Sequence, residues 1–316
     1  MAITTAQSKI RYGWETVAYL TKSTALTKNF GRDVEINWTS NNNFIKQRGI
    51  GTRNAATATP GVFEGSGTID FTLASPWIFR AVLGATPADA GATPFTHTYN
   101  ESDTLTPFSI EVGLPTGTAS IRSLLGCIVN SFTLSGNVGE DIKSSIDFMY
   151  GWETEATSSV TGVNETFTPY FFETGTLTIG SVVTPLQSFN LTITNATELV
   201  HGIGSRKAKG FIAKERDYEL SFTVAYEGND WIENLFGKTG EPLDGYVPVA
   251  SSAVTLVFTN GKTGIDKRAI TITLANLYFD EASLGLRGTE RVDEEISAFA
   301  LSCTSVVAED STENSL

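Results

Sequence analysis

The residue pattern most suggestive of chemistry occurs twice: residues 49–53 read GIGTR, and residues 202–206 read GIGSR. Closely spaced glycines ahead of a helix can bind a dinucleotide phosphate, because the backbone N–H groups reach the anion unobstructed. That fingerprint needs another glycine at its sixth position, where this chain has Asn54 and Lys207. No hydrophobic strand runs straight into a helix at either place. We therefore interpret both pentapeptides as glycine turns within loops.

A phosphate-binding P-loop is excluded in the same way. GKT occurs at 237–239 and again at 261–263, but the glycine required five positions earlier is replaced by Ile232 and by Leu256. The histidines, His97 and His201, lie in polar loops, and neither has the GxSxG elbow of a serine hydrolase. The acidic runs at 293–295 and 101–103 are typical of solvated turns. We expect no catalytic residue, no cofactor and no metal, and hence no enzyme.

Cysteine content and charge restrict the class further. Cys127 and Cys303 are far apart and belong to no CxxC motif, so the sequence predicts neither a zinc site nor a disulfide framework. The formal net charge is -13 and the pI is near 4.7. A duplex-binding surface needs clustered Lys and Arg, and beyond Arg206, Lys207 and Lys209 we find no such cluster. The N-terminal residues contain no apolar signal region, and no stretch of 18 apolar residues predicts a membrane span.

The elements that would position these residues are mostly strands. Thr, Ser, Gly, Val and Phe dominate the sequence, which favours β-structure. Apolar and polar residues alternate with the period of two of a half-buried strand. Such segments are 33–40, 67–74, 108–114, 124–136 and 141–151 in the first half, and 189–195, 217–225, 253–260, 269–279 and 294–303 in the second. Short helices are predicted at 75–84, between Ser75 and Gly84, and at 229–237.

The same elements recur in the same order, at offsets of about 151 to 154 residues. This recurrence predicts an internal duplication rather than two unrelated β domains. We expect a first domain at 1–155 with an N-terminal arm, a second domain at 165–308, and a flexible tail at 309–316. The boundary falls in 153–167, which is polar and has no period.

The polar faces of the strands carry hydroxyl and acidic residues. Such a face either meets solvent or lines the bore of a barrel built when sheets of several subunits join edge to edge. The candidate lumen-facing residues are Glu35, Thr39, Thr68, Asp70, Thr72, Thr192, Thr194, Glu219, Ser221 and Thr223.

The chain resembles the tail tube (major tail) proteins of long-tailed bacterial or archaeal viruses. The resemblance depends on IRYGWETVAYLTKSTALTKNFG (10–31), the long loop with GIGTR, the strand-helix segment GTIDFTLASPWIFRAVLG and a final hairpin before a polar C-terminus. It covers the first half directly and the second half through the repeat. It implies a mainly β fold of two tandem β-sandwich domains, each with one short helix, whose sheets join neighbours into a ring-shaped inner barrel.

The resemblance also implies a function. Stacked rings would form a virion tail tube through which the viral genome passes to the host, and an acidic lumen would let DNA pass without tight binding. Single-unit members form six-fold rings, so a duplicated chain is expected as a homotrimer with pseudo-hexameric symmetry. Expected partners are the chain itself and the tape-measure, terminator and baseplate or tip proteins, with assembly in the host cytoplasm. The candidate inter-ring loop residues are Arg48, Gly49, Gly51, Arg53, Gly202, Gly204, Arg206 and Lys207.

Two alternatives stay open at this point. A surface-displayed tandem sandwich, such as a carbohydrate-binding or adhesin module, could use Trp14, Trp38, Trp77, Trp152 and Trp231 to stack on sugars. Trp38 lies on the apolar face of its strand, however, and Trp77 and Trp231 lie on the predicted helices, where core packing is the usual role. Another structural part of the tail or capsid is the second alternative, although such parts usually have a single unit.

Overall fold

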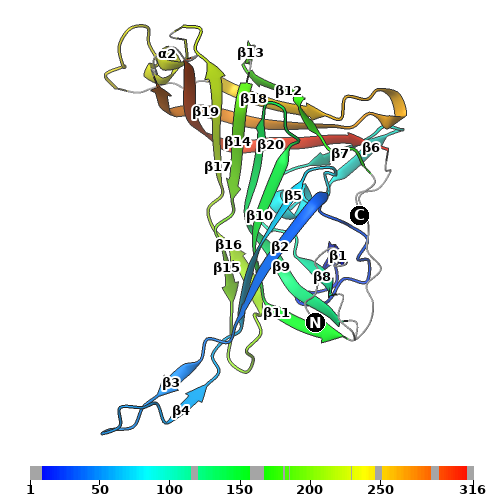
Figure 1. The fold of residues 1–316 in the computed structure, drawn as a ribbon, viewed down its shortest axis with the longest axis vertical. Coiled ribbons are helices and arrows are strands. Elements are labelled where there is room, and N and C mark those ends of the chain that lie inside the picture. Colours follow the sequence, from blue (N-terminus) through cyan, green and yellow to red (C-terminus); the bar gives the residue numbers. More distant parts are fainter. Residues whose placement is uncertain are drawn as a thin grey trace.

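A computed structural model describes residues 9–114, 120–156, 167–180, 182–184, 186–228, 230–245, 251–285 and 292–311. The molecule is mainly β, as predicted. Its largest element is an antiparallel sheet of 16 strands, which two short hairpins accompany (Figure 1). The sheet is open in the single chain, with β13 and β2 at the two ends of its main path, so one copy forms no closed barrel.

The main path of the sheet has the order β13-β12-β18-β19-β20-β17-β14-β9-β10-β5-β2. Its first-half strands are β2 (Arg32–Asn41), β5 (Glu64–Thr72), β9 (Ser120–Asn137) and β10 (Lys143–Tyr150). Its second-half strands are β12 (Phe171–Ile179), β13 (Val182–Thr184), β14 (Leu186–Thr194), β17 (Asp217–Ala225), β18 (Ser251–Thr259), β19 (Ala269–Leu284) and β20 (Asp293–Asp310). Off this path lie β1 (Lys9–Trp14), β6 (Ala88–Gly91), β7 (Phe95–Tyr99), β8 (Phe108–Leu114) and β11 (Trp152–Ala156).

The two halves of the chain repeat one strand order. In the first half the order is β2-β5-β10-β9-β8-β1, and in the second it is β14-β17-β20-β19-β18-β12. Local irregularities repeat as well. Gly126 in β9 and Asn276 in β19 both have positive φ, at 67° and 56°, and the extra residue of a β-bulge follows at Asn130 and Asp280. These two pairs of residues are each 150 positions apart, and the GIG(T/S)R loops are 153 apart. Both offsets are close to the 151 to 154 residues expected from the sequence.

The halves share one sheet, because β9 of the first pairs with β14 of the second. Alternation of side chains then sets the two faces of this sheet. Ile69, Ile146, Phe132 and Ile193 follow one another across four neighbouring strands, and all four are fully buried. A single apolar core, containing buried residues of both halves, lies behind this face.

Both predicted helices are present, and the first begins later than expected. Helix α1 (Phe79–Leu83) is buried throughout and ends at Gly84, whose φ of 97° suits the glycine and whose N–H bonds to the carbonyl of Arg80. Ser75 makes no capping hydrogen bond, because the helix begins four residues after it. Helix α2 (Asp230–Phe236) contains no fully buried residue.

Two segments differ from the sequence prediction. Residues 85–107, where the sequence predicts no helix or strand, contain the hairpin β6–β7, and β7 pairs with β20. The flexible tail does not begin at 309, because β20 continues to Asp310, which is completely buried. The remaining tail residues, 312–316, lie outside the described residues.

The two GIG(T/S)R loops form projecting hairpins. The first arm, residues 42–63, joins β2 to β5 and contains β3 (Ile45–Gln47) and β4 (Thr57–Thr59). The second arm, residues 195–216, joins β14 to β17 and contains β15 (Thr197–Val200) and β16 (Gly210–Ala213). Both leave the same end of the sheet, at the bottom of Figure 1, whereas α2 lies at the top.

Candidate functional site

The polar face of the sheet is continuous across both halves of the chain. We define this polar face by the outward side chains of β2, β5, β10, β9, β14, β17 and β20. One row of directly paired residues crosses all seven strands: Glu35, Asp70, Ser145, Thr133, Thr192, Glu219 and Phe299. Candidates that the sequence places in two separate domains therefore lie side by side on one surface.

Nine of the ten candidate lumen residues are exposed or half-buried on this face. The exception is Thr72, which is 2% exposed. Its carbonyl oxygen lies where a Cβ on Gly31 would stand, and its hydroxyl is 3.4 Å from a carboxylate oxygen of Asp33. Gly31 and Asp33, at the start of β2, thus cover Thr72 in the single chain.

The polar face is strongly acidic. Its carboxylates include Glu35, Asp70, Asp147, Asp217, Glu219 and Glu295, with Glu281 at the adjoining end of β19, and Lys143 is a cation among them. Serine hydroxyls from neighbouring strands hold two of these carboxylates, since Ser145 donates to Asp70 at 2.5 Å and Ser131 donates to Asp147 at 2.8 Å. Such a surface repels a polyanion.

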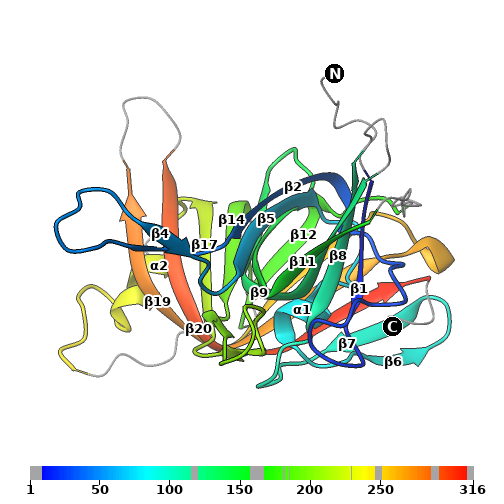
Figure 2. The ribbon, with the colours of Figure 1, turned by 90° about the horizontal axis from the view of Figure 1, so that it is seen from below.

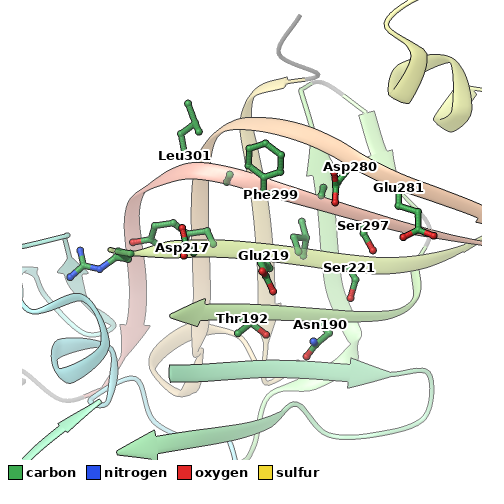
Figure 3. A pocket seen from close by; sticks show the side chains of 15 residues that line it. Asn190, Thr192, Asp217, Glu219, Ser221, Asp280, Glu281, Ser297, Phe299 and Leu301 are labelled. Atoms are coloured by element: carbon green, nitrogen blue, oxygen red, sulfur yellow. The ribbon is translucent and has the colours of Figure 1, made fainter. Parts of the chain in front are cut away.

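The second half of the polar face is hollowed. A depression of about 640 Å³ lies over β14, β17, β20 and the end of β19, and polar side chains line much of it. Figure 3 shows the side chains of Glu219, Ser221 and Ser297 on the same side of these strands. One aromatic pair interrupts the polar surface, because Tyr278 and Phe299 stack with ring centroids 5.4 Å apart. This depression is the concave side of a curved sheet and contains no catalytic arrangement.

Sequence reasoning missed the part of the polar face contributed by β9 and β10. The missed residues are Ser131, Thr133, Ser135, Asn137, Ser145 and Asp147. Their signal is available in the alternation of these strands, because Ile146 and Phe148 are apolar and their polar neighbours Ser145 and Asp147 must face the other way.

The cations of the two arms differ in what they contact. Arg48 and Arg53 are exposed, and within the described residues neither has an ion-pair or hydrogen-bond partner. Arg206 instead bonds to the carbonyl of Gly61 at 2.8 Å and to Asn42 Oδ1 at 2.6 Å, and Lys207 Nζ lies 4.7 Å from the centroid of a Trp152 ring. The second arm therefore uses its cations inside the chain.

The junction between the halves is built from buried polar contacts as well as the β9–β14 ladder. Asn195 is buried, and its amide donates to the carbonyls of Val82 and Val129 at 3.1 and 3.3 Å. The side-chain oxygen Oδ1 of Asn195 accepts a hydrogen bond from Arg216 Nε at 2.8 Å. Unpaired groups in such a position cost about 1–3 kcal/mol each, so these contacts hold the halves in fixed register.

The two histidines have structural contacts. His97 is completely buried, with Nδ1 2.7 Å from Asp89 and Nε2 3.2 Å from Asp310. Burial alone would lower the pKa of His97, but the hydrogen bonds to Asp310 and Asp89 outweigh it and raise that pKa. His201 Nε2 lies 3.0 Å from the carbonyl oxygen of Phe63. No nucleophile accompanies either ring in these contacts.

Two further features are absent from the described residues. They contain no group of three or more His, Cys, Asp and Glu residues arranged to hold a metal ion. In that same part of the chain, no helix has the length and apolarity to cross a membrane. Cys127 and Cys303 are buried free thiols, and burial raises the pKa of both.

Together, a continuous acidic sheet face, open sheet edges and projecting arms are features of a structural protein. The family model for the phage tail tube protein matches residues 5–297, and the chain belongs to this family. No curated protein matches the chain. The protein is therefore a structural, non-enzymatic component of the virion tail, and it forms the tail tube.

Proposed function

We propose that three copies of this chain close into a pseudo-hexameric ring, and that stacked rings conduct the viral genome along a lumen lined by the polar face. In this arrangement each half of the chain is one of six similar stations around the ring. The arms of one ring reach the adjacent ring.

The observation that carries this proposal is the β9–β14 junction. The repeated strand order makes β2 the counterpart of β14 and the end of β19 the counterpart of the end of β9. Among the described residues, β2 pairs only with β5, and β19 beyond Leu277 pairs only with β20. An unpaired sheet edge is a template for another chain. The junction inside one chain therefore supports an equivalent junction between chains, with β19 of one copy beside β2 of the next.

The register of the internal junction supports closure into a barrel. A row that starts at Asn37 in β2 passes through Thr68, Asp147 and Ser131 and arrives at Thr194 in β14. By the 153-residue offset Thr194 corresponds to Asn41, so the row has shifted by four residues over four strands. With a rise of about 3.3 Å per residue and about 4.8 Å between strands, this shift gives a tilt of about 35°. Closed barrels have tilts of about 35–45°.

Six such stations give 24 strands, four from each half. At that tilt and spacing, the backbone of the barrel has a diameter of about 45 Å. The acidic polar face then surrounds the bore. DNA carries about one negative charge per 1.7 Å of its axis, so an acidic wall offers the genome no tight contact.

The direction of the arms supports stacking. In the proposed ring, neighbouring subunits are joined side by side through strand pairing. The ends of the strands therefore point along the ring axis. The first and second arms extend β2, β5, β14 and β17 beyond the sheet, and both leave the same end (Figure 2, seen from that end). They therefore project toward an adjacent ring rather than toward a neighbour within the ring.

Native mass spectrometry of isolated rings, together with negative-stain averaging of tubes, tests the stoichiometry. The proposal expects a ring mass of three chains and averaged cross-sections with six similar lobes. A ring mass of six chains would refute the trimer, and a strictly monomeric protein that never forms rings would refute the assembly.

A further inference from the structure

The first arm is a basic element in an acidic protein. Between residues 42 and 63 the chain has three cations, Lys46, Arg48 and Arg53, and no acidic residue, although the whole protein carries a net charge of -13. Arg48 and Arg53 flank the tip of the arm and have no partner among the described residues. The two cations at the tip are therefore available to pair with acidic residues of another chain.

An isoleucine stands at the tip between two glycines. The Ile50 side chain is fully exposed, and the φ of Gly51, 81°, gives the tight turn that presents it. Nothing within 4 Å of Gly51 would obstruct a Cβ there, so this turn packs against nothing in its own chain. An aliphatic side chain held in water at the end of a projecting hairpin gains free energy when a partner covers it.

A matching pocket lies beside α2. We call it the α2 pocket: a surface hollow of about 820 Å³ with an apolar floor and an acidic margin. The floor includes Val183, Val224, Trp231 and Phe279, and the margin includes Glu227 and Asp230. Lys238 also lines the pocket, and its ammonium pairs with Glu241. Val183 is 63% exposed. Glu227 and Asp230 are exposed and have no ion-pair partner in the described part of the chain.

The topology puts the tip and the pocket at opposite ends of the molecule. The first arm follows the last residue of β2, whereas α2 follows the last residue of β17. Every neighbouring pair along the path β2-β5-β10-β9-β14-β17 is antiparallel, so β2 and β17 run in opposite directions. The first arm and α2 therefore leave opposite ends of the sheet. Figure 1 shows this separation along the longest axis.

The first half has the same site already filled. Trp77, the counterpart of Trp231, is buried, and Lys28 Nζ lies 4.2 Å from the centroid of its ring. Lys28, ahead of β2, thus covers the tryptophan that precedes α1. Among the described residues no such segment covers α2. The α2 pocket is therefore open to another molecule.

We propose that the α2 pocket of one copy binds the tip of the first arm of a copy in the adjacent ring. Ile50 enters the apolar floor, and Arg48 and Arg53 lie against Glu227 and Asp230 at the margin. This inference rests on the proposed stacking of rings and adds the contact that holds one ring on the next. The second arm is not the occupant, because its cations already have partners within the chain.

Polymerisation of two single-residue variants tests this contact. Ile50→Asp is expected to leave ring mass and thermal stability unchanged, because the side chain is fully exposed, while mean tube length falls by about tenfold or more. Ile203→Asp is the matched control, since Ile203 is an equally exposed isoleucine in the second arm. Its tubes should keep their length. Normal tubes from Ile50→Asp, or equal shortening by both variants, would overturn the assignment.

Charge exchange tests the pairing itself. Arg48→Glu with Arg53→Glu should shorten tubes, and adding Glu227→Arg with Asp230→Arg in the same chain should restore them. Failure of the combined variant to recover length, with intact rings, would overturn the α2 pocket as the partner. Absence of rings from the unmodified protein would instead contradict the proposed function, so the two failures are distinguishable.

Discussion

Thr133 of β9 and Thr192 of β14 stand directly opposite each other on the polar face, although 59 residues separate them in the sequence. They belong to different halves of a chain whose two halves have the same strand order. Their pairing is therefore the pattern, within one molecule, for the junction that we propose between neighbouring chains. If the ring is symmetric, the second half must present the same edge to the first half of another copy.

The first prediction is a disulfide between neighbouring chains. By the 153-residue offset of the loops, Thr39 corresponds to Thr192. By the 150-residue offset of β9 and β19, Ser283 corresponds to Thr133. In Thr39→Cys with Ser283→Cys, oxidised rings should give covalent trimers on a denaturing gel. A bond within one chain is excluded, because β2 and β19 are seven strand spacings apart, about 34 Å, and a disulfide needs Cα atoms within about 7 Å.

A shifted pair serves as the control for this cross-link. In Ser40→Cys with Ser283→Cys, the two side chains should point to opposite faces of the joined sheet and should not react. The native thiols Cys127 and Cys303 are buried and contribute no background. Rings that form normally but stay uncrosslinked in the Thr39 and Ser283 variant would exclude β19 beside β2.

The second prediction concerns the charge of the lumen. Asp147→Lys with Glu219→Lys places two cations per chain on the polar face, both at exposed positions, so rings and tubes should still form. Duplex DNA should then bind to the purified tubes at low salt and dissociate as salt rises, because phosphate neutralisation releases counterions. DNA retention by tubes, measured across a salt series, checks this expectation.

Two further variants separate location from charge. Asp147→Asn removes a carboxylate without adding a cation, and its tubes should bind no DNA. Asp103→Lys adds a cation in a loop outside the sheet and should retain far less DNA than the polar-face variant. If the Asp103 variant retains as much, the polar face does not line the channel.

Most of the sheet could be predicted from sequence, because alternation is a local signal. β8 and β17 have the predicted bounds, and β2, β5 and β10 differ by a few residues. β6 and β7 were missed because their residues, ADAG and FTHTY, give little apolar alternation in a segment rich in loop residues. What orders them is tertiary: β7 pairs with the end of β20, which is more than 200 residues away in sequence.

The candidate surface was predictable in composition but not in connectivity. Polar alternation identified Glu35, Asp70 and Glu219, yet nothing local says that β9 will pair with β14. The burial of Thr72 was equally hidden, because the covering residues reach it only when β2 and β5 align. The contacts of Arg206 with Gly61 and Asn42 join the two arms and likewise depend on the shared sheet.

The third prediction concerns pH and the buried His97. Its ring joins Asp89, in the β6–β7 hairpin, to Asp310, at the end of β20, so it fastens a hairpin of the first half to the last strand of the second. Trp77 packs against the ring edge-on at 5.5 Å, and Lys28 lies over that tryptophan. Removing one partner of a buried charged pair costs about 3–5 kcal/mol, and we expect His97→Gln to lower the free energy of unfolding by about that amount at pH 6.

The sign of the pH dependence follows from the direction of the pKa shift. The pKa of His97 is raised in the folded protein by its two carboxylate partners, against the effect of burial. Its stabilisation is therefore complete below the unfolded-state pKa of about 6.5 and is lost as the pH rises through the higher folded-state pKa. Denaturant unfolding of the wild type and His97→Gln between pH 5 and 9 should show a stability difference that shrinks at high pH. His201→Gln, which loses a contact to a backbone carbonyl only, is the control for loss of an imidazole and should give a small difference. A His97→Gln difference that stays constant over this range would mean that the ring is neutral in the fold and that its two aspartate contacts are ordinary hydrogen bonds.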